Sequence, residues 1–260
     1  MAYPINSRVE EKENNKSQPT LRDWNSQFLT CSELFFPIMP YGQIFSNNTD
    51  WPSLNELNYY KPQGLITRSG LEIFFILQKG ARHKVGLDNL YEPRIYLKGE
   101  VKTRSKNWHD FFNSQIWYHF PKSKAALNMR HFIAFDEIAQ FPWSASPISR
   151  SREQDFLTMF DEGGCALMCS AERSMPFIFG HATYEQIVYG NLDLSMCTLK
   201  IQCDDSFFNL NSIEQIAYVD HSLALLLANR SLYKKSNAFF SLSITKAKEF
   251  LLNLSQFQLL

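Results

Sequence analysis

Residues 107–131 constrain the fold of this chain most, because they predict two helices that meet at a single proline. Asn107 can cap a first helix over residues 108–118, since its side chain can accept a hydrogen bond from a free backbone N–H at the helix start. Proline disfavours helical geometry in the residue before it, so Phe120-Pro121 ends that helix. Ser123 can cap a second helix that reaches about residue 135. The sequence therefore predicts a helix hairpin over residues 108–135.

Each predicted helix carries polar side chains on one face. On the first helix, His109 and Asn113 are four residues apart and share a face, with Asp110 alongside. On the second helix, three polar positions step by four and three and share a face: Lys124, Asn128 and His131. If the two helices pack antiparallel, these faces converge on one cleft.

A cleft of this composition favours acid–base chemistry on an anion. A histidine near an aspartate can be oriented and tuned as a general base, so the candidate catalytic residues are His109, Asp110 and His131. Amide and ammonium donors hold phosphate or carboxylate groups, so the candidate substrate-binding residues include Asn113, Lys124 and Asn128. The alternative is a solvated helix face or a buried hydrogen-bond network without chemistry, because amphipathic helices routinely carry such residues.

The rest of the chain predicts an α+β fold with a small, mostly antiparallel sheet packed against the helix hairpin and further helices. Two mainly apolar segments, residues 156–160 and 165–170, flank Asp161-Glu162-Gly163-Gly164. Two glycines beside an aspartate supply the positive φ values that tight turns require, so we expect a β-hairpin over residues 156–170. Further strands are expected at residues 71–77, 176–179 and 194–203, the first of them buried.

Further helices follow from capping and periodicity. Residues 211–229 form the clearest one, where Ser212 with Gln215 fits a capping box. Shorter helices are expected at residues 21–36, ending before Pro37, and at residues 54–57, 181–189 and 245–257. Residues 94–97 fit either a strand or the end of a helix. Residues 37–62 should otherwise form an ordered loop, whose exposed aromatic residues offer a third hypothesis, a protein-binding surface.

Composition bounds the compartment and the partners. Residues 1–20 offer little apolar surface, so we expect a disordered tail before one globular domain over residues 21–260. Basic and acidic residues number 26 each, so no global field attracts nucleic acid. The five cysteines show no disulfide or zinc-knuckle spacing. The longest aliphatic run, residues 223–228, is far shorter than the roughly 20 residues that a membrane helix needs. The N-terminal residues have no apolar segment, so we do not expect them to act as a signal peptide. We therefore expect a soluble cytoplasmic protein.

A second group of residues offers metal ligands. His181 and Glu185 are four apart on a predicted helix, a spacing that can place two ligands on one face. Asp161 and Glu162 add two carboxylates, although acidic residues are also common in a turn. These four are the candidate metal ligands, with no cofactor identified. The sequence shows no P-loop, dinucleotide-binding glycine pattern or serine nucleophile elbow.

Several of these motifs together resemble a known family. They comprise Tyr91-Glu92, Arg94-Ile95, Thr103-Arg104, Asn107-Trp108-His109-Asp110-Phe111-Phe112-Asn113, Phe120-Pro121, Lys124, Asn128, His131, Phe160-Asp161-Glu162, Gly180-His181-Ala182, Tyr184-Glu185 and Asp220. This pattern is similar to the bacterial family named Domain of Unknown Function 3025, over about residues 24–229. The segment after Asn229 departs from the ending of that family.

The resemblance implies that the polar residues above belong to a family pattern, and it adds Arg94 and Arg104 as candidate anion-binding residues. It brings no activity with it, because the family has none assigned. We therefore expect an intracellular enzyme, a hydrolase or transferase, that acts on a small anionic substrate such as a phosphorylated one. In this hypothesis His109 with Asp110 supplies acid–base chemistry. The alternative is a non-catalytic structural or protein-interaction module whose polar motif is a buried hydrogen-bond network.

Overall fold

The computed structural model describes residues 23–78, 90–139, 151–234 and 239–257 of the chain. The expected tail at residues 1–20 lies outside these residues. In chain order the elements are η1 (Phe28–Cys31), η2 (Glu33–Ile38), α1 (Met39–Gly42), η3 (Gln43–Phe45), α2 (Leu54–Tyr60), β1 (Phe74–Leu77), α3 (Tyr91–Lys98), β2 (Glu100–Thr103), α4 (Trp108–His119), α5 (Pro121–Ala139), α6 (Arg152–Gly163), β3 (Gly164–Cys169), β4 (Ser174–Ile178), α7 (His181–Val188), β5 (Ser195–Gln202), η5 (Asp205–Asn209), α8 (Ser212–Ala228), η6 (Arg230–Lys234), β6 (Phe239–Ser243) and α9 (Ile244–Phe257).

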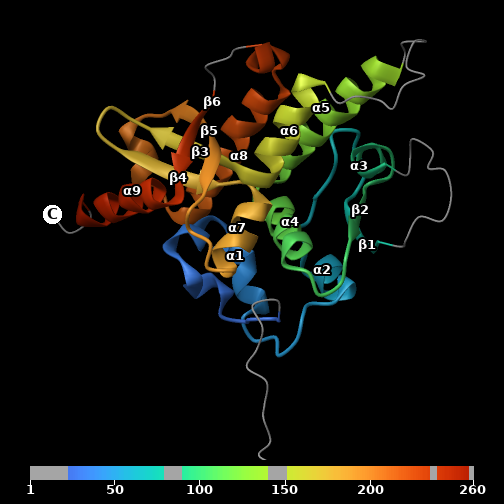
Figure 1. Cartoon of the computed structure of the whole chain (residues 1–260), viewed down its shortest axis with the longest axis horizontal. Helices are drawn as coiled ribbons and strands as arrows, with labels where there is room; N and C mark the ends of the chain where they lie inside the picture. Colours follow the sequence, from blue (N-terminus) through green and yellow to red (C-terminus); the bar gives the residue numbers. More distant parts are fainter. Residues whose placement is uncertain (1–22, 79–89, 140–150, 235–238, 258–260) are drawn as a thin grey trace, which may run out of the picture.

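The strands form two separate sheets. The larger has the order β4-β3-β5-β6, in which β3 and β5 are parallel and the two outer pairs are antiparallel. The smaller pairs β1 with β2 in parallel, with Phe74 opposite Glu100. Figure 1 shows α4 and α5 between the two sheets. The predicted α+β class with a small, mostly antiparallel sheet is confirmed.

The helix pair at the proline is confirmed, with one change. Asn107 caps α4 by accepting a hydrogen bond from the backbone N–H of Asp110. However, α5 begins at Pro121 and not at Ser123, so Ser123 is not its cap. The helices that mainly contact the larger sheet are α6, α8 and α9, whereas α4 and α5 pack mainly on α3, α6, α7 and α8. Of the predicted packing partners of the sheet, the further helices therefore contact it more than the helix hairpin does.

The predicted β-hairpin over residues 156–170 is wrong. Residues 152–163 form α6, because Ser151 and Gln154 make a reciprocal capping box that starts a helix. Leu157 and Phe160, three residues apart, are both fully buried, as one helix face requires. Only residues 164–169 form a strand, and its antiparallel partner is β4. Asp161 and Glu162 thus lie on the last turn of a helix, not in a hairpin turn.

Smaller differences concern other predicted elements. The predicted helix before Pro37 is two 3₁₀-helices, and Pro37 lies inside the second. Residues 71–77 contain a strand that is buried on one face only, since Phe75 is 2% exposed whereas Phe74 and Leu77 are 42% and 50% exposed. The open choice at residues 94–97 resolves to a helix, α3. The capping box of α8 is Asn211 with Glu214, one residue earlier than predicted. The helices near residues 54–57, 181–189 and 245–257 and the strands near 176–179 and 194–203 are confirmed.

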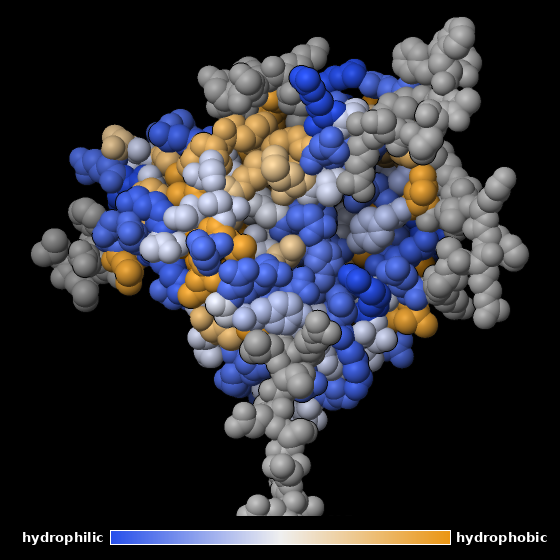
Figure 2. All heavy atoms as spheres, viewed as in Figure 1, coloured by the Kyte–Doolittle hydropathy of each residue, from blue (hydrophilic) through white to orange (hydrophobic). Residues whose placement is uncertain are grey.

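Aromatic side chains make the core beneath α4. Trp108 stacks on Trp24 with ring centroids 5.0 Å apart, and Trp51 lies 4.8 Å from Trp108. In the loop that was expected to present aromatics to a partner, Trp51 is partly buried and packs against the core, although Tyr59 is 81% exposed. On the face in Figure 2, the lower part, where residues 37–62 lie, is mainly hydrophilic. No helix in the described ranges is long and apolar enough to span a membrane.

Candidate functional site

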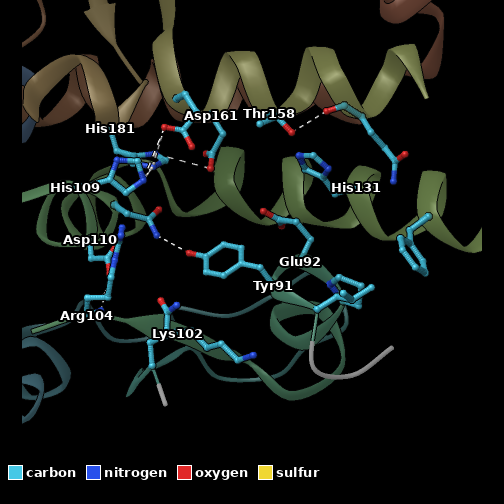
Figure 3. A pocket seen from close by; sticks show the side chains of 17 residues that line it. Tyr91, Glu92, Lys102, Arg104, His109, Asp110, His131, Thr158, Asp161 and His181 are labelled. Carbon is cyan, nitrogen blue, oxygen red and sulfur yellow. Dashed lines mark hydrogen bonds and ion pairs between the residues drawn. The ribbon is translucent and has the colours of Figure 1, made fainter. Parts of the chain in front are cut away.

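A pocket of about 870 Å³ opens between α3, β2, α4, α5, α6 and α7 (Figure 3). Its lining combines charged, amide, hydroxyl and aromatic side chains. The residues are Gln78, Leu90, Tyr91, Glu92, Pro93, Lys102, Arg104, His109, Asp110, Asn113, His131, Phe135, Gln154, Thr158, Asp161, Glu162 and His181. A volume of this size is typical of sites for small molecules.

The close approach of three chain segments builds one end of the pocket. Gly180 donates its backbone N–H to the carbonyl oxygen of Gly164, at 2.9 Å. A Cβ on Gly180 would lie 2.4 Å from the Gly164 nitrogen and 2.5 Å from the Glu162 carbonyl oxygen, so only glycine fits there. This contact places His181, the first residue of α7, beside the last turn of α6.

Two histidines and a carboxylate meet at this end. His109 on α4 and His181 on α7 lie side by side, with their Nε2 atoms 3.0 Å apart. The Oε2 atom of Glu162 lies 3.8 Å from Nε2 of His109 and 3.6 Å from Nε2 of His181. We call these three residues the histidine corner. His181 is buried, whereas the side chain of Glu162 is 44% exposed and reaches the pocket.

Further carboxylates lie behind the two imidazoles. Nδ1 of His109 is 3.2 Å from Oε2 of Glu185, whose other oxygen accepts a hydrogen bond from the Tyr189 hydroxyl. Nδ1 of His181 is 3.8 Å from Oδ2 of Asp161 and makes no hydrogen bond with any described residue. Each ring therefore turns Nδ1 towards a carboxylate and Nε2 towards the other ring.

The surroundings move the pKa values of these groups in different directions. Burial lowers the pKa of His181 to about 3, although the charge of Asp161 opposes this. Burial also acts to lower the pKa of His109, but the hydrogen bond to Glu185 and the charges of Glu162 and Glu185 outweigh it and raise that pKa. Burial raises the pKa of the Glu162 carboxyl. Asp161 has a lowered pKa despite its burial, because Lys124 and His181 favour its charged form.

A buried network supports the wall beside the corner. The Nζ atom of Lys124 donates to Oδ1 of Asp161 at 2.6 Å and to Oδ1 of Asn113 at 2.9 Å. The amide of Asn113 donates to the Tyr91 hydroxyl at 2.7 Å. The Lys124 ammonium is thus a structural counter-ion for Asp161, and the two predicted polar helix faces meet through Asn113 and Lys124.

The structure brings most of the predicted site residues to one pocket. Eight of them line it: Arg104, His109, Asp110, Asn113, His131, Asp161, Glu162 and His181. Asp110 does not hydrogen-bond to His109 as the acid–base prediction assumed. It instead accepts two hydrogen bonds from the Arg104 guanidinium, at 2.9 and 3.0 Å. Glu185 takes the position next to His109 that was expected of Asp110.

Four predicted residues lie outside the lining. Arg94 forms an ion pair with Glu100. Asn128 donates to the side chain of Glu92 at 2.7 Å. Lys124 is buried in the network described above, and Glu185 lies behind His109. Their contacts with neighbouring side chains, rather than with the pocket, suggest support of the pocket wall.

Sequence reasoning did not single out Tyr91, Lys102 or Thr158 as site residues, yet they line the pocket. Lys102 could have been found from the sequence, because charged and uncharged residues alternate over residues 100–103 as in a strand with one buried face. In the structure Val101 and Thr103 are buried, and Lys102 points to the other side of the strand. Thr158 could not be found, because its segment was predicted as a strand and not as a helix.

A family model described as "Protein of unknown function (DUF3025)" matches residues 73–176. The match begins just before β1 and ends within β4, so it includes every lining residue except His181. No curated protein and no solved structure is similar to the chain. The family resemblance is therefore confirmed over this segment.

Proposed function

Because residues 73–176 match the model of the DUF3025 family and include nearly all of the pocket lining, we propose that the function of this chain resides in that pocket. The proposed function is that of a cytoplasmic bacterial enzyme, a hydrolase or transferase, that acts on a small anionic substrate such as a phosphate ester. The observation that carries the proposal is the histidine corner at one end of a pocket whose opposite wall presents two cationic side chains.

The cationic wall supports an anionic substrate. Arg104 and Lys102 lie on the side opposite Asp161 and Thr158 (Figure 3). A guanidinium has five N–H donors, and Asp110 accepts from the Nε and Nη2 atoms of Arg104. The ion pair with Asp110 fixes the plane of the guanidinium and leaves further donors for a ligand. The side chain of Arg104 is 51% exposed, so a ligand can reach it.

The histidine corner supports a reaction that moves protons. Imidazole nitrogens and a carboxylate oxygen lie within 3.8 Å of one another at the pocket end. Such groups can take a proton from water or a hydroxyl and return it to a leaving oxygen, as hydrolysis and group transfer require. Glu185 supports this role because it orients the His109 ring.

The non-catalytic alternative has support for part of the motif. Asn113, Lys124 and Asp161 form a buried network of the kind it predicts. It also predicts that His109, Asp110 and Asn113 are deeply buried with no pocket beside them, whereas all three line the pocket described above. We therefore assign Lys124 to the scaffold and His109 to the reaction.

The test compares turnover with folding in matched variants. We expect the wild type to hydrolyse p-nitrophenyl phosphate or bis(p-nitrophenyl) phosphate in preference to the neutral p-nitrophenyl acetate. His109→Ala should lower kcat/KM by about 100-fold or more, since acid–base groups contribute about 10²–10⁴-fold. Its thermal midpoint should stay nearly unchanged, because the side chain is partly exposed and lies at the pocket. Lys102→Met should mainly raise KM.

Lys124→Met is the scaffold control. It leaves Asp161 buried without its counter-ion, so we expect a loss of stability of about 3–5 kcal/mol in urea unfolding. The proposal is contradicted if the folded wild type turns over none of the esters. It is also contradicted if His109→Ala unfolds the protein as Lys124→Met does.

A further inference from the structure

We propose that His109, His181 and Glu162 bind one divalent transition-metal ion, with Zn²⁺ as the expected occupant. The ligand atoms are the two Nε2 atoms and a carboxylate oxygen of Glu162. This metal site extends the proposed function. The binding of the ion does not depend on that function, whereas the role of the ion in the reaction rests on it. Four observations carry it: the spacing of the ligand atoms, the hydrogen positions on the rings, the local charge and the groups behind the ligands.

The spacing of the three ligand atoms suits a tetrahedral ion. Zinc binds histidine nitrogen and carboxylate oxygen at about 2.0–2.2 Å, so two ligands of a tetrahedral site lie about 3.3–3.5 Å apart. The three ligand-to-ligand distances here are 3.0, 3.6 and 3.8 Å. Shifts of a few tenths of an ångström therefore complete the geometry, and Glu162 can supply them because its side chain is 44% exposed.

The hydrogen positions on the two rings conflict unless a cation lies between them. A carboxylate only accepts, so Nδ1 of His109 carries a hydrogen towards Glu185, and neutral His109 has a lone pair on Nε2. If His181 donates from Nε2, its buried Nδ1 lone pair faces the Asp161 carboxylate at 3.8 Å. If His181 carries its hydrogen on Nδ1 instead, two Nε2 lone pairs face each other at 3.0 Å. Either a second hydrogen on His109, donated from its Nε2 to His181, or a metal ion between the two Nε2 atoms removes both conflicts.

The charge around the corner also favours a cation. Three carboxylates surround the two imidazoles, those of Asp161, Glu162 and Glu185, and Lys124 compensates only the first. The carboxylates of Glu162 and Glu185 act against an anionic ligand at this end of the pocket, although Arg104 and Lys102 line the same pocket. A divalent ion offsets the two remaining carboxylates and makes the end of the pocket compatible with the substrate class proposed above.

The groups behind the ligands are those that metal-binding histidines use. Such a histidine usually turns its other ring nitrogen to a carboxylate or carbonyl group, which fixes the tautomer and the ring orientation. Glu185 takes this position for His109, and Asp161 faces Nδ1 of His181. The two remaining predicted metal ligands, Asp161 and Glu185, therefore support the site from behind.

Three protein ligands leave a coordination position open, as in catalytic zinc sites. Glu162 and His109 both line the pocket, so this position faces the substrate space. With the ion bound, His109 would hold it, and a water molecule at the open position would pass one proton to the free carboxylate oxygen of Glu162. The resulting hydroxide would attack the phosphorus atom of the ester while the bond from phosphorus to the leaving oxygen breaks, and that oxygen would take up the proton. The ion would supply the Lewis acidity.

Metal binding is measured on the full chain, independently of turnover. After chelator treatment and dialysis, titration calorimetry with Zn²⁺ should show one ion per chain, and Co²⁺ should give a visible absorption band. His181→Ala and His109→Ala should weaken Zn²⁺ binding by more than about 100-fold. Glu185→Gln should weaken it by about 10–100-fold, as loss of a group behind a ligand does. Circular dichroism and the thermal midpoint establish that each variant is folded.

Two histidine variants are the controls. His131→Ala removes a histidine from the same pocket, and His221→Ala removes an exposed one on α8, so both should bind Zn²⁺ like the wild type. The proposal is overturned if the folded wild type binds neither Zn²⁺ nor Co²⁺, which would leave a shared proton as the only cation at the corner. Equal binding by wild type and His181→Ala overturns it too.

The two proposals fail in distinguishable ways. Stoichiometric Zn²⁺ binding without turnover of any ester contradicts the proposed function and leaves the metal site standing. Ester turnover that depends on His109 but not on Zn²⁺, in a protein that binds no metal, contradicts the metal site and leaves the proposed function standing.

Discussion

At the scale of residues, His119 shows how a polar side chain can be buried in this protein without a charge. Its Nδ1 lies 2.8 Å from the Gln115 carbonyl oxygen, and its Nε2 accepts a hydrogen bond from the Tyr41 backbone N–H at 3.0 Å. Both ring nitrogens of His119 therefore have a hydrogen-bond partner when the imidazole is neutral and carries its hydrogen on Nδ1. Burial lowers the pKa of His119 to about 4.

This shift predicts how stability depends on pH. Between about pH 6.5 and pH 4 the unfolded chain binds a proton at His119 that the folded chain does not, so stability falls as the pH falls through this range. The loss attributable to His119 is roughly 3 kcal/mol, since one pKa unit corresponds to about 1.4 kcal/mol. Urea unfolding of wild type and His119→Gln at pH 7 and pH 4 measures it. The variant should lose less stability than the wild type, and an equal loss would contradict the assignment.

Sequence patterns predicted which residues share a helix face, but not which residues they contact. The spacing of His109 and Asn113 on one helix, and of Lys124, Asn128 and His131 on the next, placed these residues on polar faces. The side chains that these residues contact could not be predicted from helical spacing. His109 lies beside Glu185, 76 positions further along the chain, and such a contact leaves no periodic signal in the sequence.

At the scale of elements, the start of α5 is capped by a residue of a distant helix, α8. The Asp220 carboxylate on α8 accepts hydrogen bonds from the backbone N–H groups of Lys122 and Ser123, at 3.1 and 2.8 Å. The Ser123 hydroxyl donates to the Asp220 carbonyl oxygen at 2.9 Å. Asp220 therefore does for α5 what a local cap does for other helices, and it joins α5 to α8.

Asp220→Ala should therefore destabilise the protein by about 2 kcal/mol, because two backbone N–H groups at a buried helix start lose their acceptor. Glu249→Ala is the matched control, since Glu249 pairs with Lys246 on the exposed face of α9 and such pairs contribute less than about 1 kcal/mol. Urea unfolding measures both. A loss no larger in Asp220→Ala than in Glu249→Ala would show that Asp220 does not cap α5.

The predicted hairpin that proved to be α6 illustrates the limit of local patterns for elements. Phe156 to Phe160 followed by two glycines fits an apolar strand and a turn, and it fits equally an apolar helix face with a glycine end. The capping box of Ser151 with Gln154 decides for the helix, because it satisfies free N–H groups at the start. The helical conformation of α6 matters for the site, because it brings Thr158, Asp161 and Glu162 into one pocket.

At the scale of the whole molecule, a contact at Gly180 connects α6, β3 and α7 and so sets the distance between Glu162 and His181. A Cβ at Gly180 would meet backbone atoms of Gly164, Glu162 and Gly163 at 2.4 to 2.5 Å. Backbone atoms cannot move aside as a flexible side chain can. Any side chain there must therefore push α7 away from the end of α6.

Gly180→Ala should destabilise the fold by about 2–3 kcal/mol, as overpacking in a tight interior does, and should weaken Zn²⁺ binding even where the protein remains folded. Gly163→Ala is the control, because a Cβ there meets only the Thr183 hydroxyl, at 3.9 Å. Thermal unfolding and Zn²⁺ titration of the two variants test this. Equal stability and equal Zn²⁺ binding of Gly180→Ala and Gly163→Ala would contradict the role of this contact.

Sequence alone determined the features that depend on near neighbours. The Asn107 cap, the break at Phe120-Pro121, the long helix near residues 211–229, the α+β class and the family pattern follow from local spacing and residue type. Only the tertiary structure decided that residues 152–163 are a helix, that Asp110 pairs with Arg104, and that His109, His181 and Glu162 converge. The physical reason is that burial and ion pairing act between segments far apart in the chain, whereas capping and periodicity act within a few residues.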